Sequence, residues 1–427
     1  MKLAYDGPID KMPLGTRALL LDRRASFEPF VDAVRPIRDA VRARGDDALR
    51  ELTARFDGWT PGALEVPRAE CERALARLSP PLARALAVAR DNVERFHRAM
   101  MPQAREVEVV PGLVAGRRLV PHARAGCYVP GGRATYPSTV LMTVTPAKVA
   151  GVREVVVCTP AARDGKVPDA TLAACAVAGA HRVFAIGGAQ AVFAMAYGTA
   201  SVPRCDKLVG PGNAYVAAAK SLVAGEVAID SPAGPSEVLV LHTGGPCPPA
   251  FAAAELLAQA EHDPEAACVL VTTDAAFGRA VKDALRPAGR GDVVAAALAK
   301  RGAILVAGSE AEAIAFSEAF APEHLVVLSP QPRATLGQLS HYGSAFLGPY
   351  SSVALGDYVS GPNHVLPTAG LARSYSGLSV DDFLRRPTHQ EATSEGLQAL
   401  AEVAQSLAML EGLPNHAESL RARRAPP

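Results

Sequence analysis

The stretch Lys207-Leu-Val-Gly-Pro-Gly-Asn213 joins a short apolar segment to the helix-forming run 214–223, and this arrangement decides the fold class. Two earlier segments repeat it: 155–158 precedes the alanine-rich run 169–180, and 182–186 precedes Gly187-Gly188 and a helix starting at Ala189. Short apolar strands that alternate with helices are typical of a parallel, doubly wound sheet.

A second set of apolar segments predicts a second sheet, with helices between its strands. These segments are 237–241, 269–273, 303–306 and 325–328. We therefore expect an α/β protein with two Rossmann-like, doubly wound parallel-sheet domains, joined near 231–236. The expected boundaries are an N-terminal arm at 1–25, a first α/β domain at 26–127 plus 236–380, a second at 128–235, and a helical tail at 381–427. A hairpin is expected at 107–120, with Pro111-Gly112 as its turn.

Composition excludes several classes of protein. The chain has 427 residues, of which 49% are hydrophobic and 20% are charged, so it can bury a large core. A net charge of +1 gives no reason to expect a nucleic acid or an acidic membrane surface as partner. The first ten residues lack the apolar run of a signal peptide. The seven cysteines are scattered and never spaced as CxxC, which suits reduced thiols in a cytoplasmic protein.

The run 183–203 resembles a membrane span only because it contains no charged residue. Gly187-Gly188 and Gln190 interrupt it. We interpret it as a buried strand, a glycine turn and a buried helix, so no membrane partner is expected.

One half of a metal site is suggested near Pro264. Gln259 and His262 follow an apolar helical run and are three residues apart, so on a helix they would share one face before Pro264 ends it. An imidazole and an amide oxygen there could bind zinc. The alternative is a histidine that serves only solvent contact or the helix dipole.

Glycine turns between strand and helix suggest a phosphate-binding role. Such turns expose backbone N–H groups beside a helix N-terminus. Gly210-Pro-Gly212 gives G-x-G without the third glycine of the dinucleotide fingerprint, so no full GxGxxG is present. Ordinary strand–helix connections would look the same.

Further titratable residues lie towards the C-terminus. Glu323-His324 opens a predicted strand and offers two groups suited to proton transfer, although ligands usually gather at the other ends of parallel strands and a surface dipeptide is the simpler explanation. The stretch 356–368 has the composition of a loop and carries Asp357 and His364. Together, the side chains of Gln259, His262, Asp357 and His416 would suit zinc, but their spacing leaves open whether they meet.

The sequence resembles the histidinol dehydrogenase family over nearly its whole length. The matching stretches are Tyr128-Val-Pro-Gly-Gly132, Tyr136-Pro-Ser138, Gly187-Gly-Ala-Gln190, Asp206-Lys-Leu-Val-Gly-Pro-Gly-Asn213, Ala233-Gly-Pro-Ser-Glu-Val238, Gln259-Ala-Glu-His-Asp-Pro264, Ala321-Pro-Glu-His-Leu325 and 356–368. The resemblance implies a four-electron oxidation of L-histidinol through L-histidinal to L-histidine with two NAD⁺, the last step of histidine biosynthesis.

The resemblance also implies roles for individual residues. NAD⁺ would be contacted by Tyr128, Gln190 and Asn213, and one zinc ion per subunit would be held by Gln259, His262, Asp357 and His416. The zinc ligands and four further residues would meet the substrate, namely Ser236, His324, His364 and Glu411. Glu323 and His324 would transfer protons. The family's form is a homodimer that exchanges its C-terminal tails, so Glu411 and His416 would come from the partner.

Two departures and two alternatives accompany this resemblance. Residues 123–127 and 231–232 differ from the family's usual apolar residues near the cleft. A related zinc- and NAD-dependent dehydrogenase of another small diol, such as a sulfopropanediol, is one alternative, but a sulfonate would favour Arg or Lys over Glu411 and His364. A zinc hydrolase with Glu323 as base is the other, and it would leave the glycine turns without a role.

Overall fold

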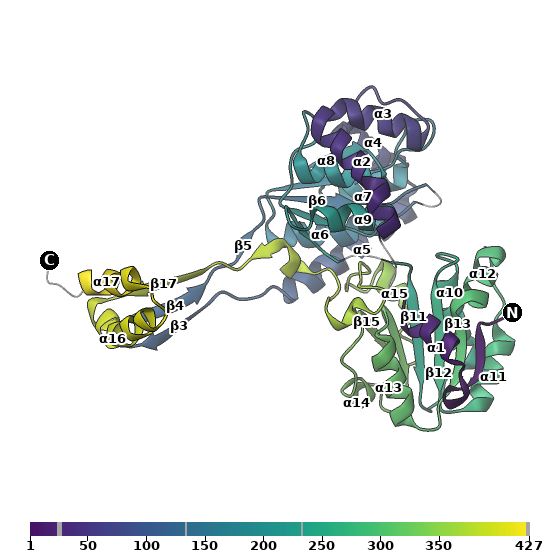
Figure 1. Ribbon diagram of the computed structural model, residues 1–427. Coiled ribbons are helices and arrows are strands. Elements are labelled where there is room, and N and C mark those ends of the chain that lie inside the picture. The colour runs from purple at the N-terminus through teal and green to yellow at the C-terminus, as the bar shows by residue number, and fades with distance from the viewer. Residues whose placement is uncertain (24–27, 133–134, 232–233, 424–427) are drawn as a thin grey trace. The chain divides into compact units, whose positions relative to one another are not determined.

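The computed structural model describes residues 1–23, 28–132, 135–231 and 234–423, which form two compact units (Figure 1). The first unit comprises Met1–Met100 and Ala123–Phe383, and the second comprises Met101–His122 and Leu384–Pro427. Pro232 and Ala233, within the predicted junction 231–236, lie outside the described residues, as do residues 24–27 of the predicted arm and first domain.

The first unit contains a six-stranded parallel sheet, here called the first sheet, with the order β1-β13-β12-β11-β14-β15. Its strands are β1 (Tyr5–Pro8), β11 (Glu237–His242), β12 (Ala267–Thr272), β13 (Gly302–Val306), β14 (His324–Leu328) and β15 (Ser344–Leu347). Alternate strand residues face two cores, as Val238 and Val240 do on one side and Leu239 and Leu241 on the other. The sheet is therefore buried on both faces, which explains its nearly continuous apolar strands.

Helices cover both faces of the first sheet. One core receives residues of α10 (Pro249–Ala260), α11 (Ala275–Ala284), α12 (Gly291–Arg301) and α15 (Val353–Tyr358). The other receives residues of α1 (Leu14–Leu21), the 3₁₀ turn η1 (Ile9–Lys11) and α13 (Glu310–Phe320). α14 (Pro332–Leu336) contacts β14 and β15.

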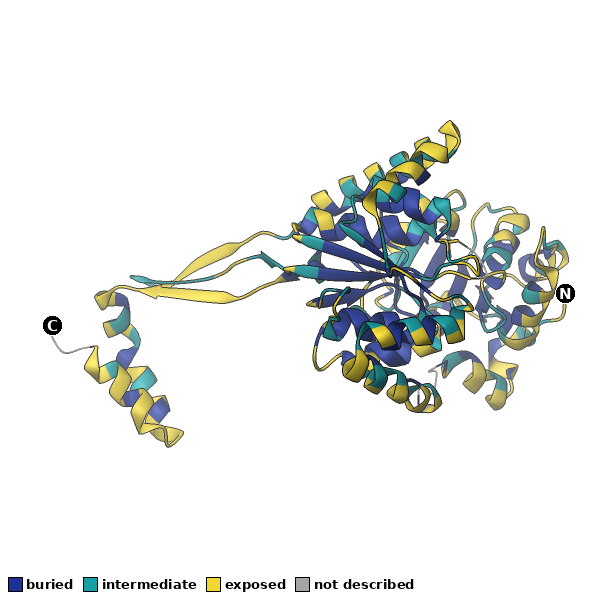
Figure 2. Ribbon diagram, turned by 90° about the horizontal axis from the view of Figure 1, so that it is seen from above, coloured by how far each residue is buried: buried dark blue, intermediate teal, exposed yellow. Residues whose placement is uncertain are grey.

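The second sheet has the order β10-β9-β6-β7-β8-β2. Its strands are β6 (Arg124–Tyr128), β7 (Glu154–Thr159), β8 (Arg182–Ala185), β9 (Lys207–Val209) and β10 (Ala228–Ile229), all parallel, and β2 (Glu65–Val66), which is antiparallel to β8. One core gathers residues of α2 (Glu28–Arg44), α3 (Asp46–Asp57), α8 (Gly188–Tyr197) and α9 (Ala214–Val223). A second helical layer is formed by α4 (Arg68–Arg77), α5 (Pro80–Ala99), α6 (Pro137–Ala150) and α7 (Asp169–Ala178), which contact one another. Figure 2 shows buried strands and helices with one buried and one exposed side.

The second unit is small. β3 (Arg105–Val110), β4 (Leu113–Arg117) and β17 (Thr388–Ala392) form an antiparallel sheet, and β5 (Val120–Pro121) pairs with β16 (Leu384–Arg385). Helix α16 (Ser394–Leu410) packs on α17 (Pro414–Ala422). The predicted hairpin is thus confirmed as β3 and β4. The tail supplies β16, which pairs with β5, and then β17, which pairs with β4.

The predicted fold class is confirmed, but the structure draws the boundaries inside it differently. Residues 5–8 of the expected arm are an edge strand of the first sheet. Helices α2 and α3, expected with the first domain, bury Val34 and Leu49 in the core of the second sheet. Residues 124–127 also belong to that sheet, in β6. The predicted domain assignments of residues 5–8, of α2 and α3, and of residues 124–127 were therefore wrong. For the helices, apolar spacing shows which face is buried but not which sheet covers it.

The C-terminal tail starts at Leu384 and not at residue 381 as predicted. Residues 381–383 lie in η3 (Val380–Phe383), which contacts α6 and buries Phe383 in the first unit. Among the described residues, no helix is long and apolar enough to cross a membrane.

Candidate active site

A buried Glu–His pair lies where β14 begins. Glu323 immediately precedes the strand and His324 is its first residue, and both are buried. The Glu237 N–H donates to Glu323 Oε2 at 2.7 Å, and His324 Nδ1 donates to the Glu237 carbonyl oxygen at 3.1 Å. Because β11 and β14 are neighbours, the first residue of β11 holds both members of the pair.

The other nitrogen of His324 faces a carboxylate. Its Nε2 lies 3.3 Å from Asp357 Oδ1, an ion-pair distance without hydrogen-bond geometry. Asp357 belongs to the last turn of α15, so the start of the predicted loop 356–368 is helical, which corrects that expectation. Because an acceptor faces each nitrogen of His324, both nitrogens have a partner for a proton, and this favours the doubly protonated imidazole.

This arrangement raises the pKa of both members of the pair. Burial is the main cause for Glu323, since it disfavours the carboxylate. For His324, burial opposes the charge, but the Glu323 carboxylate and then Asp357 favour it more strongly, and the pKa rises. Asp357 is also a predicted zinc ligand, so a cation bound there would oppose the shift of His324.

His364 binds the backbone of Asp357. Its Nδ1 donates to the Asp357 carbonyl oxygen at 2.7 Å, and its Nε2 lies 3.2 Å from the Thr139 hydroxyl in the first turn of α6. A carbonyl can only accept, so Nδ1 carries the proton and the hydroxyl donates to Nε2. Burial lowers the pKa of His364, which therefore favours the neutral form. These contacts join the layer over the second sheet to the predicted substrate-binding loop.

Gln259 and His262 lie at the end of α10, just before β12. The helix ends at Ala260, so the predicted continuous helical face is wrong, and a turn in which the His262 N–H donates to the Gln259 carbonyl at 3.2 Å keeps the two residues adjacent. Gln259 is buried and His262 reaches solvent. Protein atoms around the His262 imidazole still lower its pKa by desolvation, while the Asp357 carboxylate acts in the opposite sense.

The residues predicted to contact NAD⁺ lie at the carboxyl ends of strands in the second sheet, whereas the Glu323–His324 pair lies at the amino end of β14. Tyr128 ends β6, and its hydroxyl accepts from the Gly188 N–H at 3.0 Å where α8 begins. Gln190 is buried in the first turn of α8, and its Nε2 has no hydrogen-bond partner within the described chain. Asn213 caps α9 through Oδ1, which accepts from the N–H groups of Tyr215 and Val216. These are the ends at which parallel sheets bind nucleotides.

A buried ion pair fixes the glycine turn beside Asn213. Gly210 has φ +118°, and a Cβ there would overlap the Tyr128 carbonyl oxygen. Its N–H donates to Asp230 Oδ2 at 2.7 Å and its carbonyl accepts from Lys220 Nζ at 3.0 Å. Lys220 also pairs with Asp230 and donates to the Ser231 carbonyl. The turn is therefore rigid, and its close approach to β6 requires glycine.

The predicted residues thus form three groups. Those from Glu323 to His364 and the end of α10 meet at the amino ends of β11, β12 and β14, and half-buried Ser236 directly precedes β11. Tyr128, Gln190 and Asn213 lie at the carboxyl ends of the second sheet. Glu411, the residue after α16, and His416, in α17, are exposed in the second unit.

Sequence reasoning missed four supporting residues. Glu237 was quoted only as part of a motif, and Arg23, which binds it, had no signal at all. Thr139 follows the quoted Tyr136-Pro-Ser138 but had no assigned role. Glu255 lies one helical turn before Gln259, a spacing that could have flagged it, and its carboxylate accepts from the Val353 N–H at 3.1 Å, which ties α10 to α15.

A cavity of about 810 Å³ lies at β15, the strand next to β14 at the edge of the first sheet. It is lined by α14, β15 and neighbouring residues, including Arg333, Phe346 and Leu355, and by none of the predicted site residues. The cavity borders the cluster around His324, because Phe346 lines it and the Phe346 ring centre lies 6.0 Å from that of His324.

The residues present suit a metal ion in their chemistry. In the part of the chain that the structure describes, no three His, Cys, Asp or Glu side chains lie together as a metal site would need. The predicted set explains this, because Gln259 is an amide and His416 belongs to the second unit. His262 and Asp357 remain, close enough for the carboxylate to affect the imidazole's pKa. Nitrogen and oxygen donors of this kind fit zinc.

Two mainly parallel sheets, one with glycine turns at its carboxyl ends and one with a buried acid–base cluster at its amino ends, define a two-sheet α/β enzyme. Comparison with known proteins narrows this class. The family model described as histidinol dehydrogenase matches residues 21–424. The chain belongs to the histidinol dehydrogenase family, a family of NAD-dependent oxidoreductases.

Individual relatives agree with this assignment over more than nine-tenths of their length. A histidinol dehydrogenase from Methanothermobacter thermautotrophicus is 50% identical over 404 residues, covering 94% of this chain and 95% of the relative. One from Xanthomonas campestris pv. campestris is 48% identical over 398 residues, covering 92% of each. The crystal structure of histidinol dehydrogenase from Elizabethkingia anophelis gives a TM-score of 0.91 at 34% identity, covering 99% of this chain and 98% of that one.

Proposed function

We propose that the protein oxidises L-histidinol through L-histidinal to L-histidine, with two NAD⁺ as hydride acceptors and one zinc ion per subunit. The observation that carries the proposal is the buried Glu323–His324 pair, held by Glu237 and faced by Asp357. A buried acid–base pair with shifted pKa values is typical of proton transfer in catalysis.

The first oxidation needs a base for the hydroxyl proton. His324 Nε2 takes that proton while the carbinol C–H leaves as hydride to the first NAD⁺, which forms the aldehyde, NADH and one proton. Nδ1 stays fixed on the Glu237 carbonyl, so Nε2 is the nitrogen free to exchange a proton. Glu323 Oε2, 3.5 Å from Nδ1, stabilises the imidazolium that results.

The second oxidation needs a water molecule. Glu323 removes a proton from water as the water oxygen adds to the aldehyde carbon, and His324 returns the proton that it took in the first oxidation to the aldehyde oxygen, which gives the hydrated aldehyde. His324 then takes a hydroxyl proton from that species while its C–H leaves as hydride to the second NAD⁺, and the product is the carboxylic acid. Burial raises the pKa of Glu323 and so strengthens it as a base.

The remaining site residues bind and orient. Gln259, His262, Asp357 and His416 would hold the zinc ion, which when bound supplies a template for the substrate's imidazole and amino nitrogens. Ser236, His364 and Glu411 would contact the amino alcohol together with these ligands. Tyr128, Gln190 and Asn213 would contact NAD⁺, supported by the rigid glycine turns around them.

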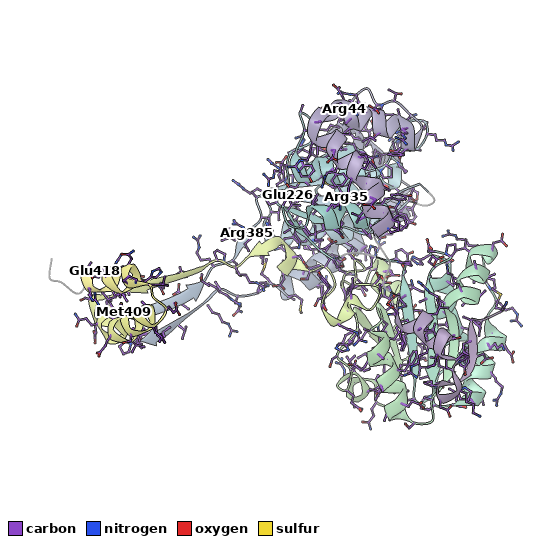
Figure 3. All side chains as sticks on the ribbon, viewed as in Figure 1. Arg35, Arg44, Glu226, Arg385, Met409 and Glu418 are labelled. Carbon is purple, nitrogen blue, oxygen red and sulfur yellow. The ribbon has the colours of Figure 1, made fainter. Side chains whose placement is uncertain are left out.

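We also propose a homodimer in which Glu411 and His416 complete the partner's site. The supporting feature is an apolar stripe on α16, formed by Val403, Leu407 and Leu410, which are 59%, 55% and 82% exposed. Their spacing of four and three residues places them on one helical face, and Met409 next to them is also exposed (Figure 3). Exchange of identical elements is an economical route to a symmetric dimer.

A cytoplasmic location belongs to the same proposal. All seven cysteines are free, and six of them are buried. Unpaired thiols suit a reducing compartment.

The activity is tested by NADH formation with L-histidinol, with and without a chelator. We expect two NADH per histidinol and loss of turnover after metal removal. If NADH formed only with another diol, the protein would be a related dehydrogenase that acts on that diol. Hydrolysis without NAD⁺ would overturn the proposal.

The shared site is tested by mixed dimers of His262→Ala and His416→Ala, each expected to be inactive alone. If the tail acts in the partner's site, one of the two sites in a mixed dimer combines an intact His262 with an intact His416, and activity returns. With mixing confirmed by mass, no recovery would show that each tail serves its own chain.

A further inference from the structure

We infer that Glu237 and Arg23 form a positioning pair for Glu323 and His324, an inference that rests on the catalytic roles proposed above. Neither residue touches the reacting atoms. Their role is to hold the backbone of β11 at the one point where both members of the catalytic pair are bound.

The backbone of Glu237 is the shared attachment point. Its N–H donates to Glu323 at 2.7 Å and its carbonyl accepts from His324 at 3.1 Å, so both bonds depend on the orientation of a single residue. Glu237 is the first residue of β11, and the preceding residue is the proposed substrate contact Ser236. A rotation at this strand end would displace both catalytic side chains together.

The side chain of Glu237 is locked in turn. Arg23 Nε lies 2.8 Å from Oε1 and Nη2 lies 3.2 Å from Oε2, and the two side chains are 1% and 3% exposed. The Ala369 N–H also donates to Oε1 at 2.8 Å. Ala369 has φ +58°, an uncommon conformation for a residue with a side chain, and it follows the segment that carries His364. One carboxylate therefore fixes β11 and the His364 segment.

Arg23 is itself fixed from three directions. Its Nη1 donates to the Leu20 carbonyl, its Nη2 donates to the Phe320 carbonyl, and its Cζ lies 3.5 Å from the centre of the Phe320 ring. Phe320 ends α13, three residues before Glu323. The guanidinium thus links the end of α1, the start of β11 and the approach to β14.

Stability alone is a weak explanation for such a pair. A buried ion pair often adds no more to stability than apolar residues of the same volume, because both charges lose their hydration. A bidentate guanidinium–carboxylate pair does fix geometry in two directions. The pair joins the three segments whose relative placement sets the geometry of the catalytic pair, so positioning is the role that its location supports.

The chain contains a matched control. Arg182 contacts Glu65 through Nε and Nη2, donates to the Ser201 carbonyl at 3.0 Å and lies over the Phe184 ring, at the start of β8. It reproduces each type of Arg23 contact in the second sheet, although it is more exposed. No proposed site residue contacts it.

The experiment compares Arg23→Met, Arg23→Lys and Arg182→Met in the zinc-loaded dimer. For Arg23→Met we expect kcat to fall about 10–100-fold, the range for groups that orient catalytic residues, with KM for histidinol and zinc content nearly unchanged. Both half-reactions should fall by the same factor, because Glu323 and His324 shift together. Arg23→Lys should recover part of kcat, and Arg182→Met should retain kcat even if it lowers the melting temperature.

Several results would overturn the inference. One is a fall in kcat for Arg23→Met no larger than for Arg182→Met, and another is a loss confined to one half-reaction or to KM. If Arg23→Met does not fold, Glu237→Gln replaces it, because the amide keeps the size and an acceptor for Ala369 but loses the charge that binds Arg23. Failure of the proposed function is recognisable separately, since Glu323→Gln would then retain full activity in both half-reactions.

Discussion

The two sheets of the first unit carry their candidate sites at opposite strand ends. In the second sheet, Tyr128 ends β6 and Gly210 follows β9, at the carboxyl ends where parallel sheets usually bind ligands. In the first sheet, Glu237 and His324 begin β11 and β14, at the amino ends. The same architecture therefore carries two candidate sites that are built in different ways.

The difference shows what each kind of site requires. At a carboxyl end, the strand, its glycine turn and the helix start are consecutive in sequence, so backbone N–H groups are presented locally. At the amino ends of the first sheet, the site needs segments far apart in the chain, from Arg23 through Glu237 and Glu323 to His364. Such a site depends on side-chain bonds between segments, which makes it sensitive to single substitutions.

The largest effect should come from the amino-end site. His262→Ala should remove a zinc ligand and lower turnover by about 10³-fold, since bound metal contributes several kcal/mol of stabilisation to a reaction of this kind. Zinc content after dialysis and NADH formation measure the two consequences. His389→Ala, at an exposed histidine of the second unit, is the control. Metal retention with full turnover in His262→Ala would show that His262 is not a ligand of the metal.

A smaller effect should come from the carboxyl-end site. Gly210→Ala would force a side chain onto the Tyr128 carbonyl at φ +118°, so the turn must shift. A displacement of about 1 Å can cost about 10²-fold, which we expect as a rise in KM for NAD⁺ while zinc content stays unchanged. Gly225→Ala is the matched control, because a Cβ there meets nothing within 4 Å. Equal effects in both variants would contradict an NAD site at this turn.

The smallest effect concerns a buried histidine outside both groups. His97 is fully buried in the last turn of α5, and within the described chain neither ring nitrogen has a hydrogen-bond partner. Burial lowers its pKa to about 4, against a weaker opposite effect of Asp382. Between that value and the ordinary 6.5 the unfolded chain binds more protons, so stability present at pH 7 is lost as pH falls through this window, by about 3 kcal/mol.

The measurement is urea unfolding of the parent and His97→Leu at pH 7 and pH 4. The variant should lose about 3 kcal/mol less of its unfolding free energy over this range than the parent does. His389→Leu, at an exposed histidine of the second unit, is the control for the loss of an imidazole outside the core. An unchanged pH dependence in His97→Leu would mean that this histidine is protonated in the folded state.

Sequence predicted the strands and the strand–turn–helix connections of the second sheet well, and for a physical reason. The helix expected at 214–223 has those bounds, and Asn213 caps it, because strand, turn and cap signals are local. At the amino ends, residue spacing singled out Gln259 with His262 and Glu323 with His324, and the composition of 356–368 singled out Asp357 and His364. The family resemblance supplied their roles, and the helix that the spacing implied stops at Ala260.

The missing part was long-range. No local pattern associates Arg23 with Glu237, 214 residues away, or Thr139 with His364. The same limit put α2 and α3 with the wrong sheet, since their amphipathic faces fit either core. Pairing between distant segments depends on the assembled fold rather than on the periodicity of any one segment.

The most direct test of the amino-end site is the effect of Glu323→Gln on the two half-reactions measured separately. Glu323 is assigned to water activation, which only the aldehyde step needs, so oxidation of added histidinal should slow by about 10²–10⁴-fold, while His324 still supports oxidation of histidinol to some extent. Equal losses in both half-reactions would contradict these roles for the pair at the start of β14.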